Sequence, residues 1–140
     1  MPDIFVFGTL KQGFPNFNSN AGQRITGRYK TRHCYPLYLV GERHSPWMVL
    51  EQGKGFSVVG EIYQVDKATL TAMDKLERVG EADGYRRVTI EVTNIDNGDV
   101  RQVDAYLKPR EQMRDADIRL ELEGEYLLEH AALYRSRSSD

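Results

Sequence analysis

Residues 4–13 read Ile4-Phe5-Val6-Phe7-Gly8-Thr9-Leu10-Lys11-Gln12-Gly13, and the rest of the chain is organised around them. The apolar run consists of aromatic and β-branched residues and ends directly at a glycine, which predicts a buried strand that stops abruptly. Gly8 has no side chain, so a ligand could approach the backbone closely at the turn that follows. Backbone amides at such a turn can bind an anion or a developing oxyanion. The alternative is an ordinary first strand with a glycine turn.

The composition is that of a globular protein and gives no sign of a nucleic-acid or membrane partner. The chain has 140 residues, of which 40% are hydrophobic and 29% charged, and its formal net charge is −2. We expect a single domain over residues 1–134 and a flexible tail over 135–140. The basic residues are scattered, and no apolar run is long enough to span a membrane. Cys34 is the only cysteine, which excludes an internal disulfide and favours a reducing compartment, the cytoplasm.

Hydrophobic periodicity predicts many strands and few helices. Strands are expected over 4–7, 27–38, 37–40, 47–50, 57–65, 85–93 and 100–107. Asn97-Gly98 is a strong hairpin signal between the last two strands, and Gly60 suggests a bulge or a close contact. Helices are expected over 67–78, with Asp66 as N-cap and Gly80 at the end, and over 113–134, with a break near Gly124. This order favours an α+β fold around a mostly antiparallel sheet, which could close into a small barrel.

Glu77 is the most informative candidate for chemistry. It follows Leu70 by seven positions and Met73 by four, so it lies on the apolar stripe of the expected helix. A carboxylate there is either at the edge of the core, paired with a basic side chain, or buried. Burial would raise its pKa toward neutrality, where a carboxylate becomes a useful general acid or base. Asp74 and Arg78, by contrast, are expected on the surface of the helix.

Other chemistries find little support in the sequence. The three histidines, His33, His44 and His130, are too dispersed for a metal motif. Cys34 follows His33, but neighbouring residues on a strand point to opposite faces, which argues against a thiol nucleophile. Glycine-rich nucleotide-binding motifs are absent. Trp47 is most simply a core or pocket-wall residue. Tyr106 and Tyr134 are also possible pocket-wall residues that could lend hydroxyls to a cavity, although such tyrosines usually serve packing.

Several stretches together resemble the γ-glutamylcyclotransferase-like superfamily, and within it the γ-glutamylaminecyclotransferase, or AIG2-like, branch. That family typically reads F-V-Y-G-T-L-K where this chain has residues 5–11. Further similarity lies in order along the chain, in Tyr35-Pro36-Leu37, Gly41-Glu42, Pro46-Trp47, residues 60–66, Leu76-Glu77 and Tyr85-Arg86-Arg87. The resemblance covers roughly residues 3–110, and in the remainder only Tyr134 is suggestive.

The resemblance implies a fold, a reaction and a site. The fold would be a small mixed, mostly antiparallel β-barrel with packed helices. The substrate would be a small γ-glutamyl compound whose α-amino group attacks its own γ-carbonyl, releasing an amine and 5-oxoproline without a metal or organic cofactor. Glu77 would be the catalytic acid and base, and the substrate would bind at Phe7, Gly8, Thr9 and Leu10.

The family pattern differs from this chain at one position, since Phe7 stands where the family usually has tyrosine. Three functions therefore stay open. The first is the cyclotransferase, and the second is a non-catalytic module that binds a small acidic ligand or a partner protein on the same fold. The third is an enzyme that removes a γ-glutamyl protecting group from a biosynthetic intermediate. The sequence names neither the amine nor the oligomeric state.

Overall fold

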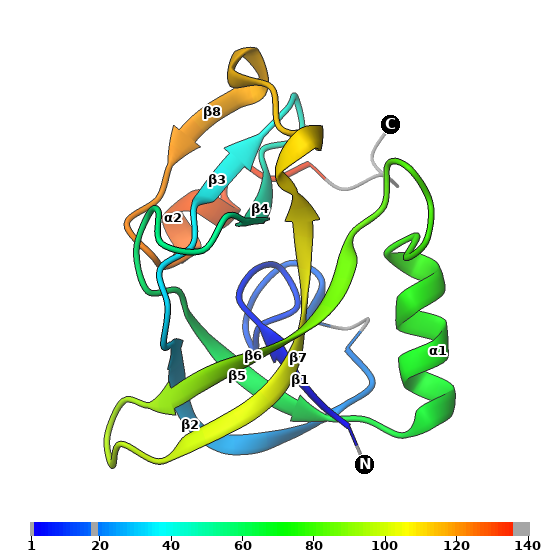
Figure 1. Ribbon diagram of the computed structural model, residues 1–140, viewed down its shortest axis with the longest axis vertical. Coiled ribbons are helices and arrows are strands. Elements are labelled where there is room, and N and C mark those ends of the chain that lie inside the picture. The colour runs from blue at the N-terminus through cyan, green and yellow to red at the C-terminus, as the bar shows by residue number, and fades with distance from the viewer. Residues whose placement is uncertain (1, 18–19, 136–140) are drawn as a thin grey trace.

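A computed structural model describes residues 2–17 and 20–135, which form an eight-stranded sheet with helices beside it (Figure 1). The strands are β1 (Asp3–Val6), β2 (Gln23–Thr31), β3 (Leu37–Val40), β4 (Ser45–Leu50), β5 (Val59–Gln64), β6 (Arg86–Asn94), β7 (Val100–Pro109) and β8 (Ile118–Glu121). The helices are α1 (Lys67–Leu76), α2 (Leu128–Ala131) and two single 3-10 turns, η2 (Arg110–Gln112) and η3 (Asp115–Asp117).

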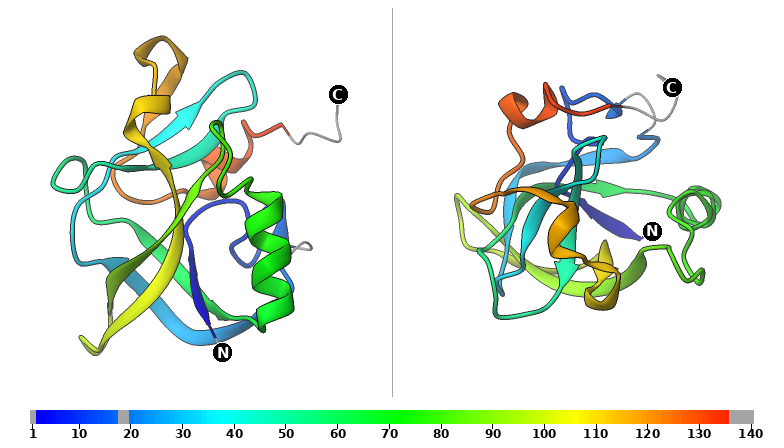
Figure 2. Two further views of the ribbon diagram at one scale, coloured as in Figure 1. Left: turned by 45° about the vertical axis from the view of Figure 1, so that its right-hand side comes forward. Right: turned by 90° about the horizontal axis from the view of Figure 1, so that it is seen from above.

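The sheet closes on itself. Its strand order is β1-β5-β2-β6-β7-β4-β3-β8, and an additional pairing of β1 with β7 joins the first five of these strands into a ring. The pairs β1–β7 and β4–β7 are parallel, and the other pairs are antiparallel. Figure 2 shows β3, β4 and β8 stacked beyond one end of this ring, with α1 standing against its outside. The expected α+β class and the closed, mostly antiparallel sheet are confirmed.

Strand β1 is buried on both faces, which explains its unbroken apolar sequence. Phe5 packs inside the ring with the main core, whereas Ile4 and Val6 point outward to a second cluster that also contains Tyr63 and Tyr106. Successive side chains of a strand point to opposite faces, so both faces need a cover. Helix α1 covers the outer face through Leu70 and Met73, which pack against that second cluster. The helix is therefore held next to the end of β1.

The hairpin signal is confirmed. Strands β6 and β7 pair in register from Arg86 with Leu107 to Thr93 with Val100. Gly98 has a φ of 79° in the connecting turn, a conformation that costs glycine little. The side-chain oxygen of Asn94 accepts hydrogen bonds from the backbone amides of Asp96 and Asn97, at 2.8 and 3.2 Å, and so fixes the start of the turn.

Helix α1 begins as predicted but ends earlier. The Asp66 carboxylate accepts a hydrogen bond from the Thr69 amide at 2.7 Å, which is the expected N-cap. The helix stops at Leu76 rather than near Gly80, and Glu77 is its C-cap. Arg78 has a φ of 56°, and Val79 N–H donates to the Asp74 carbonyl at 2.9 Å, the hydrogen bond of a Schellman motif. Glu77 consequently lies at the end of the helix, one turn after Met73.

The predicted helix over 113–134 is wrong. Residues 118–121 form strand β8 on β3, with Tyr38 opposite Glu121 and Leu39 opposite Leu120, and only 128–131 are α-helical. The edge of β3 offers backbone hydrogen-bond partners to residues 118–121, and these partners cannot be recognised from the sequence of that segment alone. Neither α-helix of the described residues, ten and four residues long, could cross a bilayer. Of the expected flexible tail, residues 136–140 lie outside the described residues.

Candidate active site

A cavity of about 300 Å³ lies where β1 ends, between the loop that follows this strand and the end of α1. The loop contributes residues 7–10 and Asn16, and the helix end contributes Met73, Leu76 and Glu77. The remaining lining residues come from β1, the β3–β4 connection, β4, the residue just before β6, β7 and the C-terminal segment: Phe5, Val6, Arg43, Ser45, Pro46, Tyr85, Tyr106 and Tyr134. The cavity is thus built from segments distant in the sequence.

Most of the residues proposed from the sequence meet at this cavity. Phe7, Gly8, Thr9 and Leu10 line it, as do Glu77, Tyr106 and Tyr134. Trp47 does not, because its ring packs with Val40, Val49 and Met113 and lies 4.4 Å from the Lys108 ammonium. Its neighbour Pro46 takes the place on the wall, and a Cβ atom on Gly8 would come within 2.8 Å of the Pro46 side chain.

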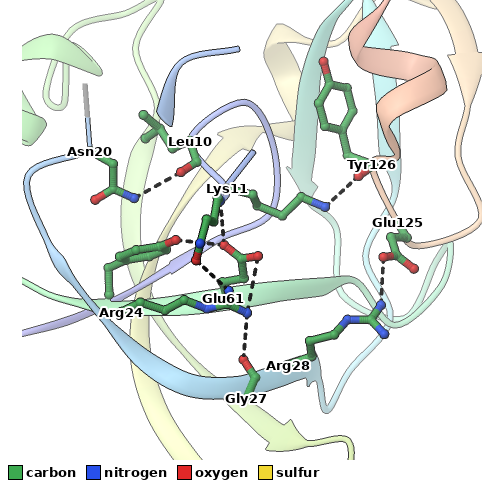
Figure 3. Close-up of polar contacts among 11 residues, drawn as sticks. Leu10, Lys11, Asn20, Arg24, Gly27, Arg28, Glu61, Glu125 and Tyr126 are labelled. Atoms are coloured by element: carbon green, nitrogen blue, oxygen red, sulfur yellow. Dashed lines mark hydrogen bonds and ion pairs between the residues drawn. The ribbon is translucent and has the colours of Figure 1, made fainter. Parts of the chain in front are cut away.

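The loop after β1 is anchored from behind by two charged side chains (Figure 3). Lys11 is only 5% exposed, and its ammonium donates to the Tyr126 carbonyl at 2.6 Å and lies 4.2 Å from the Phe14 ring. Burial lowers the pKa of Lys11, while the nearby carboxylates of Glu125 and Glu61 oppose this shift. Glu61 accepts hydrogen bonds from the Gln12 amide and the Tyr63 hydroxyl, each at 2.9 Å. These contacts fix the loop against β5 and the C-terminal segment.

The hydrogen bond between Tyr63 and Glu61 makes the free energy of unfolding depend on pH in the alkaline range. Burial, followed by its hydrogen bond to Glu61, raises the pKa of Tyr63 to about 12, against about 10 in an unfolded chain. The stabilising contribution is therefore complete below about pH 10 and is lost as pH rises through about 12. We expect Tyr63→Phe to reduce the dependence of the unfolding free energy on pH across this window. Urea denaturation at several pH values measures the unfolding free energy of both proteins. The prediction would be contradicted if this energy changed with pH in the same way for the variant and the wild type.

On the cavity side, the side-chain amide of Asn16 links the loop after β1 to the C-terminal segment through hydrogen bonds. Asn16 donates through Nδ2 to the Thr9 hydroxyl at 2.9 Å and to the Tyr134 hydroxyl at 3.1 Å. The Asn16 backbone amide also donates to the Thr9 carbonyl at 2.8 Å. Tyr134 is thereby held at the cavity although it lies 118 positions from Asn16 in the sequence.

Asp74 is not the surface residue that the helical pattern predicts. Its carboxylate accepts hydrogen bonds from the Tyr106 hydroxyl at 2.7 Å and from Arg87 Nε at 2.9 Å. Arg87 also donates to Asp104 on β7 at 2.9 Å. Burial and the Asp74 carboxylate raise the pKa of Tyr106, so its hydroxyl stays protonated and remains a donor. This network fastens the last turn of α1, just before Glu77, to β6 and β7.

We expect Tyr106→Phe to lower the free energy of unfolding by about 1.5–3 kcal/mol, the usual range for a hydrogen bond to a charged group. Tyr38→Phe is a matched control, because none of the described hydrogen bonds uses the Tyr38 hydroxyl, and it should change stability little. Chemical denaturation of the three proteins measures the difference. Equal stabilities for the two variants would show that the contact with Asp74 contributes nothing.

Some residues that line the cavity could not be recognised from the sequence. Asn16 and Arg43 line the cavity, but each comes from a loop or turn without a recognisable motif. Tyr85 was noted only within a longer similarity; its backbone amide donates to the Glu77 carbonyl at 3.0 Å. Glu77 is half-buried and lines the same cavity as Gly8 and Thr9 of the glycine turn. A carboxylate beside potential amide donors can move a proton and accommodate developing negative charge.

The family follows from comparison with known proteins. Residues 4–128 match the family described as gamma-glutamyl cyclotransferase, AIG2-like. This range covers most of the chain, so the protein belongs to that family, and the resemblance found in the sequence is confirmed.

Individual relatives agree with this assignment. The gamma-glutamylaminecyclotransferase of Rattus norvegicus is 39% identical over 97 residues, which cover 66% of this chain and 64% of that protein. The Mus musculus protein of the same name is 38% identical with the same coverage. The match thus spans slightly less than two thirds of the length of these relatives. The crystal structure of an AIG2-like protein from Mus musculus has a TM-score of 0.83 at 32% identity, covering 98% of this chain and 97% of that one.

Proposed function

We propose that this protein is a γ-glutamylamine cyclotransferase, an enzyme that converts a γ-glutamyl amine to 5-oxoproline and the free amine. The observation that carries the proposal is the shared cavity: Glu77 lines the same space as Phe7, Gly8, Thr9 and Leu10. Family membership supports it, since relatives in this family are named gamma-glutamylaminecyclotransferase.

The proposed reaction is an internal aminolysis. The substrate's α-amino nitrogen attacks the carbonyl carbon of its own γ-amide, which forms the new C–N bond of a five-membered ring. The former γ C–N bond then breaks, and the amine leaves. Because the nucleophile and the carbonyl belong to one molecule, a site that holds the folded conformer gains a large effective concentration.

Glu77 has two roles in this proposal. An ammonium group cannot attack, so the carboxylate first takes a proton from the α-ammonium group and leaves a neutral amine as the nucleophile. A departing amine is a poor leaving group, so the same carboxyl then returns a proton to its nitrogen. One acid–base group thus serves both steps in turn. Glu77 is half-buried at the end of α1, and the hydrogen bond between Asp74 and Tyr106 holds the turn that precedes it. Both features support this assignment.

The loop after β1 would bind the charged parts of the substrate. Its amides would hold the α-carboxylate of the glutamyl group or the oxyanion that develops on the γ-carbonyl. Such donors stabilise a transition state only when they are already in position. The anchors at Lys11 and Glu61 supply that rigidity from the side of the loop away from the cavity.

A panel of γ-glutamyl compounds tests the function directly. The purified protein is incubated with γ-glutamyl alkylamines, γ-glutamyl amino acids and ε-(γ-glutamyl)lysine, and 5-oxoproline is measured. Release from at least one of them, dependent on the protein, is the expected result. No release from any would instead favour a binding module on the same fold. Phe7, which replaces the family's usual tyrosine at the cavity wall, is the residue that keeps this second function open.

We also propose the cytoplasm as the working compartment. The single cysteine, Cys34, is unpaired, and the proposed chemistry needs no disulfide.

A further inference from the structure

Arg43 places a positive charge at the cavity that the proposed reaction does not use. It lies in the turn between β3 and β4 and lines the same space as Glu77. Its side chain is partly buried, and its only described side-chain hydrogen bond is a long one, 3.5 Å from Nη2 to the Ser45 hydroxyl. A guanidinium can donate up to five hydrogen bonds, so most of its capacity is available to a ligand.

No described carboxylate forms an ion pair with Arg43. The ion pairs among the described residues engage other lysines and arginines, and none involves Arg43, Arg119 or Arg135. Partial burial of a cation without an anion is unfavourable. A ligand that brings a carboxylate would remove this cost and form strong, charge-assisted hydrogen bonds.

The positive charge continues past Tyr134. This residue lines both the main cavity and a second hollow, whose wall includes His44, Arg119 and Arg135. Among the residues that line the second hollow, Glu42 is the one carboxylate. The backbone amide of Arg135 donates to the backbone carbonyl of Arg43 at 3.0 Å, so the two segments that carry these arginines lie side by side. Arginines therefore line both of the hollows that Tyr134 borders.

We propose that Arg43, supported by Arg119 and Arg135, forms a subsite for a carboxylate carried by the leaving amine. The preferred substrates would then be γ-glutamyl derivatives of amino acids rather than of simple alkylamines. This inference rests on the proposed function: Glu77 and the loop after β1 take the glutamyl end, which leaves Arg43 on the same cavity wall to meet the amine end. Arginine suits this role because its planar guanidinium can bind both oxygens of a carboxylate.

Matched substrates that differ in one charge test the subsite. The γ-glutamyl derivatives of β-alanine, 4-aminobutyrate and 6-aminohexanoate are each compared with the corresponding neutral carboxamide. We expect the wild-type protein to prefer the acid of suitable length in kcat/KM. Arg43→Gln should reduce the ratio of acid to amide about tenfold, the effect of losing one charge-assisted hydrogen bond. Arg43→Lys should retain part of the preference.

Arg114→Gln is the control, because Arg114 is exposed, does not line the cavity and has no ion pair among the described residues. It should leave the ratio unchanged. An equal loss on acid and amide in Arg43→Gln would place Arg43 at the glutamyl end and overturn the proposal, as would a wild-type protein without a preference. Circular dichroism establishes that each variant is folded.

Failure of the proposed function can be recognised separately. If the wild-type protein released 5-oxoproline from none of these compounds, the cyclotransferase assignment would fail. The subsite would then be examined by NMR titration with 6-aminohexanoate and 6-aminohexanamide. Shifts of the arginine Nε–H signals with the acid alone, absent in Arg43→Gln, would support a carboxylate subsite. Identical spectra with both compounds would refute it.

Discussion

Glu77→Gln is expected to fold and to lose roughly two or more decades of kcat, the usual consequence of removing a general acid–base group. The amide has nearly the same shape as the carboxylate but cannot accept and return a proton. Glu77 also caps α1, but through its backbone amide, which bonds to the Met73 carbonyl at 2.9 Å and is unaffected by the substitution. The measurement is the rate of 5-oxoproline release at saturating substrate, together with a thermal unfolding curve.

Glu81→Gln is the matched control, since Glu81 is an exposed carboxylate in the loop that follows the same helix. It should retain full turnover. If Glu77→Gln kept near-normal turnover while folded, Glu77 would have no part in proton transfer. A loss of activity in both variants would instead point to a disturbed loop.

Gly60→Ala is the substitution from which we expect the largest loss of stability. Gly60 lies in β5 beside β1, and an added Cβ would come within 2.4 Å of the Val6 carbonyl oxygen and 2.7 Å of the Phe5 ring. Neither neighbour can move freely, because one is backbone in a paired strand and the other is in the core. We expect a loss of about 3 kcal/mol or more, at the upper end for overpacking.

Gly53→Ala separates this clash from the general effect of replacing a glycine. No atom lies within 4 Å of a Cβ added at Gly53, whose φ is +101°. The cost there should be the backbone strain alone, about 1–2 kcal/mol. Urea denaturation compares the two variants. A loss at Gly60 no greater than that at Gly53 would mean that β1 and β5 separate easily.

The parts of the fold that were predictable are those with local causes. The apolar run before Gly8, the Asp66 cap and the Asn97-Gly98 turn each act within a few residues, and each gave the correct element. The closeness of Gly60 to another backbone was also anticipated. Residues 118–121 were misassigned because short apolar segments look alike as helix or strand. The edge of β3 decides between them, and that edge is formed about 80 positions earlier.

The candidate site was predictable to a similar extent. The spacing of Glu77 indicated a carboxylate beside an apolar surface, and in the structure Glu77 caps α1 and lines the cavity together with Met73 and Leu76. Asp74 was misjudged because its partners Arg87 and Tyr106 lie 13 and 32 positions away, on other elements. Arg43 gave no signal, since a lone arginine in a turn is ordinarily solvated.

The hydrogen bonds from Asn16 to Thr9 and Tyr134 have a consequence for biosynthesis. A ribosome delivers the β1 loop first and Tyr134 more than a hundred residues later, so a nascent chain cannot assemble the cavity until translation has passed that tyrosine. Fragments from premature termination would accordingly lack this part of the cavity wall even where the barrel has formed. A reporter fused downstream of Tyr134 would emerge beside the cavity, whereas one fused ahead of β1 would leave it unobstructed.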